Sequence, residues 1–175
     1  LSVLPVAAAV QLNETWRIVV SPAASETERF AARELQDHVR KITGLMLPIE
    51  VGPVGENPAV VIDGSNAFPD FSGPLHWNAE KPEIDQYMVR FDGRTLYLAG
   101  NSPRGALYAV YAFLRDVVHV HWLWPGESGT FLPDSKLIAI PDGLALQETA
   151  AFQYRGIHWC RLHYDSETEL WGARN

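Results

Sequence analysis

Hydrophobic and polar positions follow two different periods along this chain, and they predict strands and helices in turn. Short runs rich in β-branched residues predict strands, whereas an apolar residue at every third or fourth position predicts a helix with one buried face. The resulting order is strand, helix, two strands, a hairpin, helix and two strands. The expected strands cover 16–20, 47–51, 59–63, 86–91, 95–99, 121–124 and 137–141.

Helix signals are clearest at two places. Ser25 is a candidate N-cap with Glu28 three residues later, the capping-box spacing, and Gly44 suits the left-handed position that ends a helix. Ser102 and Pro103 begin the second helix, because proline needs no N–H partner in the first turn. Asp92-Gly93 between two alternating runs predicts a tight hairpin. The expected fold class is therefore an α/β (α+β) sandwich, a mixed sheet with two helices packed on one face.

Composition limits the functions that this fold can serve. The chain has 175 residues, an apolar fraction of 47% and a net charge of −7, with 14 Lys and Arg against 21 Asp and Glu. This acidic balance argues against nucleic-acid binding, and no apolar run is long enough to span a membrane. The single Cys160 permits no internal disulfide. Residues 1–15 have two interpretations, the remnant of a signal peptide or an N-terminal strand.

The C-terminal part predicts the start of a second domain. Residues 147–159 have the pattern of a linker entering a new strand, and an acidic helix start follows at 165–169. We therefore expect three parts: the N-terminal stretch 1–15, an α/β domain at 16–148, and the beginning of a truncated catalytic barrel at 149–175. On this interpretation the chain is a fragment of a longer protein.

Several segments carry a resemblance to a known family. They are Ala32-Arg33-Glu34-Leu35-Gln36, Lys41-Ile42-Thr43-Gly44, the Gly100–Tyr111 segment, Trp124-Pro125-Gly126-Glu127 and Phe152-Gln153-Tyr154-Arg155-Gly156. Together they are similar to the N-terminal domain of α-glucuronidases and β-hexosaminidases, over roughly residues 16 to 171. The resemblance implies a small α/β domain without catalytic residues, followed by a (β/α)8 barrel whose first strand is 154–159 and whose first helix is 166–175.

The same resemblance implies three substrate-binding residues. Arg155 matches the arginine that holds sugar hydroxyls in β-hexosaminidases, and His158 and Trp159 lie nearer the end of the expected barrel strand, where barrel active sites gather. For Arg155 the alternative is a structural ion pair at the domain junction, and for Trp159 it is core packing. Cys160-Arg161 departs from the α-glucuronidase pattern, which has an acidic or amide residue after the tryptophan, so the sugar is not carried over.

Other candidate groups have simpler interpretations. Asp165, Glu167 and Glu169 fit a helix N-terminus, where negative charge is stabilising, so no catalytic residue is assigned within this chain. His119, His121, His158, Cys160 and His163 carry zinc-binding atoms, but their spacing matches no compact motif and no metal or cofactor is predicted. The aromatic residues Trp122, Trp124 and Phe131 fit either a sugar platform or a surface that docks onto the barrel.

The expected function is that of a non-catalytic N-terminal domain in a bacterial glycoside hydrolase, secreted or periplasmic, that acts on a polysaccharide or glycan. Its partners would be the catalytic domain of the same protein and, through that domain, a carbohydrate substrate. This chain alone is expected to show no turnover. The alternative is a stand-alone carbohydrate-binding or scaffold module without catalysis.

Overall fold

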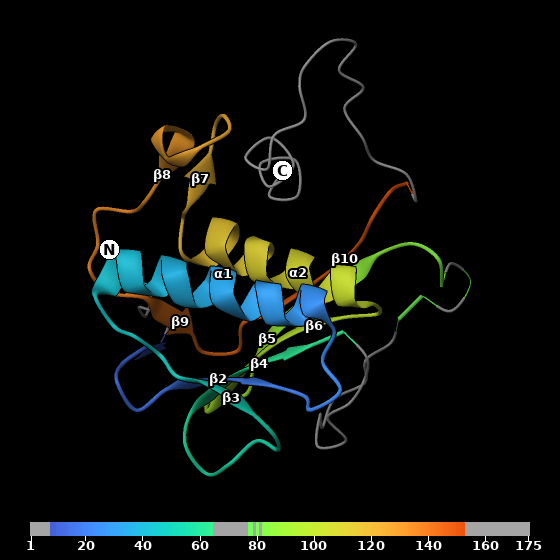
Figure 1. Cartoon of the computed structure of the whole chain (residues 1–175), viewed down its shortest axis with the longest axis horizontal. Helices are drawn as coiled ribbons and strands as arrows, with labels where there is room; N and C mark the ends of the chain where they lie inside the picture. Colours follow the sequence, from blue (N-terminus) through green and yellow to red (C-terminus); the bar gives the residue numbers. More distant parts are fainter. Residues whose placement is uncertain (1–7, 65–76, 79, 81, 153–175) are drawn as a thin grey trace, which may run out of the picture.

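The computed structural model describes residues 8–64, 77–78, 80 and 82–152, and it places them in one mixed sheet covered on one face by two helices (Figure 1). The six-stranded sheet has the order β10-β5-β6-β4-β2-β3. Its strands are β2 (Arg17–Val20), β3 (Ile49–Val51), β4 (Ala59–Asp63), β5 (Gln86–Phe91), β6 (Thr95–Gly100) and β10 (Ala145–Thr149). β2, β3, β4 and β6 run parallel, whereas β5 and β10 pair antiparallel with their neighbours.

Helix α1 (Glu26–Thr43) begins and ends where the local signals predict. The Ser25 and Glu28 side chains form the capping box, and Gly44 takes a left-handed φ of 80° while its N–H bonds to the Arg40 carbonyl. The buried face includes Leu35, Val39 and Ile42, which pack against the sheet in the main hydrophobic core. Local capping and apolar spacing therefore agree with the tertiary position of this helix.

Helix α2 (Pro103–Ala112) lies beside α1 on the same face of the sheet, and it continues into the π-helical turn η1 (Phe113–Val117). Ser102 caps α2 by accepting a hydrogen bond from the Gly105 N–H, and Pro103 lies in the first turn. The segment ends at His119, which has a φ of 66°, the one non-glycine residue with positive φ in the described part of the chain.

Two short two-stranded sheets flank the main sheet. β1 (Ala9–Gln11) pairs antiparallel with β9 (Ala139–Pro141). β7 (His121–Trp122) pairs with β8 (Thr130–Phe131), with the 3-10 turn η2 (Glu127–Gly129) between them. In Figure 1 this hairpin projects beyond the helical layer, away from the sheet.

The linker interpretation of residues 147–149 is wrong. These residues belong to β10, which pairs along its whole length with β5 and forms one edge of the main sheet. The main sheet therefore extends at least to Thr149. The predicted barrel strand and helix at 154–159 and 166–175 lie outside the described residues.

Candidate functional site

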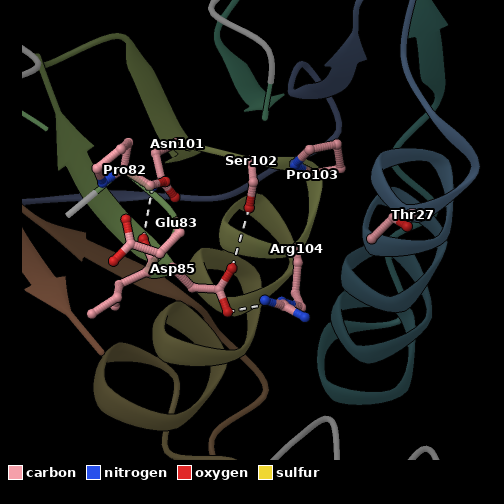
Figure 2. Close-up of a pocket in the computed structure, with 9 residues that line it drawn as sticks. Thr27, Pro82, Glu83, Asp85, Asn101, Ser102, Pro103 and Arg104 are labelled. Carbon is pink, nitrogen blue, oxygen red and sulfur yellow. Dashed lines mark hydrogen bonds and ion pairs between the residues drawn. The ribbon is translucent and has the colours of Figure 1, made fainter. Parts of the chain in front are cut away.

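A polar pocket lies at one end of the central strands, where β5 begins and β6 ends (Figure 2). The antiparallel β5–β6 hairpin brings these two ends together, with Tyr87 opposite Gly100. The pocket has a volume of about 310 Å³, and its polar side chains are Thr27, Glu83, Asp85, Asn101, Ser102 and Arg104.

Asn101 fixes the backbone of this pocket. Its side-chain oxygen accepts the Gln86 N–H at 2.9 Å, and its amide nitrogen donates to the Ile84 carbonyl at 2.8 Å. The Asn101 N–H in turn donates to the Gln86 carbonyl at 3.1 Å. A single side chain thus satisfies backbone groups that the end of the β5–β6 ladder leaves unpaired.

Asp85 is the central charged residue, with 5% of its surface exposed. One carboxylate oxygen accepts from the Ser102 hydroxyl at 3.3 Å, and the other accepts from Arg104 Nε at 2.8 Å. The hydrogen bond that Arg104 donates to Asp85 raises the pKa of the guanidinium, although partial burial of the arginine opposes the shift. Figure 2 shows the Asp85 carboxylate between these two side chains.

Close backbone contacts explain why glycine occupies two positions near this pocket. A Cβ on Gly105 would lie 2.5 Å from the Gln86 carbonyl oxygen, and a Cβ on Gly100 would lie 2.2 Å from the Ala106 nitrogen. The first turn of α2 therefore rests directly on the strand ends. Since both oxygens of Asp85 bind groups of the same turn, the pocket primarily anchors α2 to the sheet.

The sequence identified only part of this site. Ser102 and Pro103 were predicted as the start of a helix, and the structure confirms it. Asp85 was missed, because its partner Arg104 is 19 residues away and no local pattern links the two. An aspartate immediately before a strand, followed later by Asn-Ser-Pro-Arg at a helix start, was the available signal.

The predicted aromatic surface divides into two parts. Trp122 is 5% exposed and its ring lies edge-on to His38 and Tyr111, at centroid distances of 5.6 and 5.5 Å. Its assignment to an exposed sugar platform or docking surface is therefore wrong. Trp124 and Phe131 are each 46% exposed and contact one another edge-to-face at 5.6 Å.

The remaining predicted residues are not brought together by the described structure. Arg155, His158 and Trp159 lie outside the described residues, as do Cys160, His163 and the acidic residues 165, 167 and 169. His119 and His121 are both exposed. Among the described residues, no group of three or more His, Cys, Asp or Glu side chains is arranged to hold a metal ion. In the same part of the chain, no helix is both long and apolar enough to cross a membrane.

Comparison with known proteins yields structural neighbours only. No family model matches the sequence, and no curated protein matches it. One similar structure is a GH138 enzyme targeting pectin rhamnogalacturonan II, with 14% identity and a TM-score of 0.39 over 58% of this chain. Another is the GH20 β-N-acetylhexosaminidase from Streptomyces coelicolor A3(2), with 16% identity and a TM-score of 0.48 over 84% of this chain. A third is CpGH84D, with 17% identity and a TM-score of 0.45 over 78% of this chain.

All three neighbours are glycoside hydrolases, and each is much longer than the matched region. The match covers 10% of the GH138 enzyme, 24% of the GH20 enzyme and 21% of CpGH84D. At these identities and TM-scores, the likeness assigns no activity, ligand or residue role to this chain.

Proposed function

We propose that the α/β unit beginning near residue 16 and ending at β10 is a non-catalytic N-terminal domain of a glycoside hydrolase acting on a polysaccharide or glycan. Catalysis would belong to a (β/α)8 barrel starting within 149–175, where Arg155, His158 and Trp159 would contact the sugar. The parent protein would be secreted or periplasmic and bacterial. The support is the resemblance of the Gly100–Tyr111 segment and its neighbours to the N-terminal domains of α-glucuronidases and β-hexosaminidases.

The engagement of Asp85 carries the non-catalytic part of this proposal. Glycoside hydrolysis needs two carboxyl groups on either side of the bond, one of them free to donate or accept a proton. In the polar pocket, Asp85 instead has both oxygens bound to Ser102 and Arg104 of one helical turn. The other carboxyl of that pocket, Glu83, is exposed to solvent.

The β7–β8 hairpin supplies the surface proposed to dock onto the barrel. Five of the nine large exposed apolar side chains among the described residues lie in this hairpin or in the segment just after it, namely Leu123, Trp124, Phe131, Leu132 and Leu137. We call them the hairpin patch. The chain leaves the described unit at Phe152, which is 71% exposed, and the end of β10 projects on the same side of the helices as the hairpin (Figure 1). The following domain is therefore the proposed occupant.

The carbohydrate-binding module is the second candidate, and Trp124 is the observation that favours it. Its exposed ring is held by the edge of Phe131 and by a hydrogen bond from its indole N–H to the Ser128 hydroxyl at 3.2 Å. A fixed, partly exposed indole is suited to stack on the apolar face of a sugar ring.

The first experiment measures hydrolysis of a panel of 4-nitrophenyl glycosides by the purified 175-residue chain. We expect no turnover above the buffer blank, because both oxygens of Asp85, the buried carboxylate of the polar pocket, are bound to Ser102 and Arg104. Hydrolytic activity that copurifies with the chain and is lost in the Asp85→Asn variant would refute the non-catalytic assignment. Sequencing the encoding gene beyond codon 175 tests the barrel. A stop codon there would contradict the barrel, whereas about 250 further residues with strand–helix periodicity would support it.

A second experiment separates docking from sugar binding. In the longer protein, Trp124→Ser with Phe131→Ser should lower the melting temperature, while Met46→Ser, at an exposed apolar side chain outside the hairpin patch, serves as the matched control. If the hairpin patch docks onto the barrel, the wild-type 175-residue chain should not be retained on insoluble polysaccharides. The double variant of this chain should then show the same lack of retention. Retention by the wild-type chain that Trp124→Ser abolishes would favour the module instead.

A further inference from the structure

A second cavity lies at the edge of the main sheet, where β10 pairs with β5. Its volume is about 380 Å³, and it is lined by Met88, Arg90 and Phe91 of β5 and by residues 143–147. Side chains alternate along β5, so Val89 and Phe91 join the core under the helices while Met88 and Arg90 lie on the opposite face. Met88 is 6% exposed and Arg90 is half-buried.

The cavity has a positively charged side chain and, among its described lining residues, no negatively charged one. Among the described residues that line it, Arg90 is the only charged one. In the described part of the chain, the Arg90 side chain forms no hydrogen bond or ion pair, whereas Arg17 pairs with Glu50 on the same sheet and Arg104 pairs with Asp85. Partial removal of a guanidinium from water without a counter-charge is unfavourable. The sign of this local charge is opposite to the net charge of the whole chain, which is −7.

We propose that the cavity at Arg90 binds the carboxylate group of a small organic acid. A guanidinium presents a planar fork of donors that matches the two oxygens of a carboxylate. Met88, on the same face of β5 as Arg90, would contact the carbon skeleton of the ligand. The cavity volume lies at the lower end of the range for small-molecule sites, about 300–1,000 Å³, so a single sugar acid or a compound of similar size fits. This inference is independent of the function proposed above, because it concerns the cavity between β5 and β10 and requires no barrel.

The two methionines of the chain provide the probe. In protein labelled with 13C at the methionine methyl groups, D-glucuronate should shift the Met88 signal saturably, with a dissociation constant of about 1 mM for a ligand of this size. D-Glucose is the neutral control with the same ring, and it should leave Met88 unchanged. The Met46 signal is the internal control, because this side chain is 61% exposed and does not line the cavity. Equal shifts with glucose and glucuronate, or no saturable shift of Met88, would overturn the proposal.

Variants test the role of the guanidinium. Arg90→Gln should weaken glucuronate binding by at least about tenfold, the loss typical of one charged hydrogen bond. Arg33→Gln is the matched control, since Arg33 is exposed on α1 and lies outside the cavity, and it should bind like the wild type. Undiminished binding by Arg90→Gln refutes the site. If circular dichroism shows that this variant does not fold, the methyl titration of the wild-type protein with glucuronate and glucose still tests the proposed site.

A third ligand distinguishes the source of the carboxylate. N-acetyl-aspartate amide presents the same group as an acidic protein side chain would. Tighter binding of this compound than of glucuronate would support the carboxylate site and identify a protein side chain as its ligand. Tighter binding of glucuronate would identify a sugar acid.

Discussion

Removal of the Glu28 carboxylate should destabilise the fold more than the loss of an ordinary helix cap. Glu28 is 1% exposed and connects two parts of the chain. One of its oxygens accepts from the Ser25 N–H at 2.8 Å and from the Ser25 hydroxyl at 2.7 Å, which closes the capping box. The other accepts from the Gly64 N–H at 2.8 Å, immediately after β4. The start of α1 is thereby attached to the end of a central strand.

The magnitude follows from these contacts. In Glu28→Ala, the buried Gly64 N–H loses its acceptor, which costs about 2 kcal/mol. Loss of the capping box adds about 1 kcal/mol, so the free energy of unfolding should fall by about 3 kcal/mol. Glu28→Gln keeps the side-chain volume and one carbonyl oxygen, and it should cost about half as much because one of the two acceptor positions becomes a donor.

The assay is urea unfolding followed by tryptophan fluorescence and by circular dichroism, with linear extrapolation to water. Glu26→Ala is the matched control. Glu26 lies in the same first turn but is exposed, so its loss should cost only about 0.3 kcal/mol through the helix dipole. A free energy of unfolding for Glu28→Ala within about 1 kcal/mol of that for Glu26→Ala would contradict this role of Glu28, and so would a Glu28→Gln variant less stable than Glu28→Ala.

Three further predictions test other parts of the fold. His119→Gly should raise stability by about 1 kcal/mol, because glycine adopts the observed φ of 66° without steric cost; a lower calorimetric melting temperature would contradict this. Gly105→Ala should cost at least about 2 kcal/mol, since its Cβ would lie 2.5 Å from the Gln86 carbonyl oxygen, whereas Gly55→Ala, with no atom near its Cβ, should be nearly neutral in the same urea assay. Burial, the larger cause, and the hydrogen bond to Glu148, the smaller one, raise the pKa of Tyr87 above its ordinary value of 10.0. The stability that this group contributes is therefore present below pH 10 and is lost as the pH rises further. Tyr87→Phe should therefore be less stable than wild type by about 1 kcal/mol at pH 8, and the difference should shrink above pH 10; a difference that grows with pH would show that the sign is wrong.

Local patterns predicted the elements whose boundaries depend on nearby residues. The capping box of Ser25 and Glu28, the left-handed Gly44 and the Ser102-Pro103 helix start are all satisfied within a few positions along the chain. The β4 and β5 strands appear at the predicted residues for a similar reason, because their apolar content suits burial in the sheet. The fold class followed from the order of these elements.

Other features exist only because distant residues meet. Residues 147–149 carry little apolar pattern, and they form a strand because the edge of β5 offers unpaired backbone groups. Trp122 and Trp124 look alike in sequence, but the strand alternation and the contacts with His38 and Tyr111 bury the first and leave the second exposed.

The sequence by itself determined the helices, the main strands and the class of fold, because these rest on capping, turn chemistry and periodicity between near neighbours. The tertiary structure alone decided which charges are paired. It joined Asp85 to Arg104 at the start of α2 and left Arg90 without a partner in the described part of the chain. Ion pairing depends on separation in space, and residues far apart in sequence acquire a defined separation only when the sheet and helices pack together.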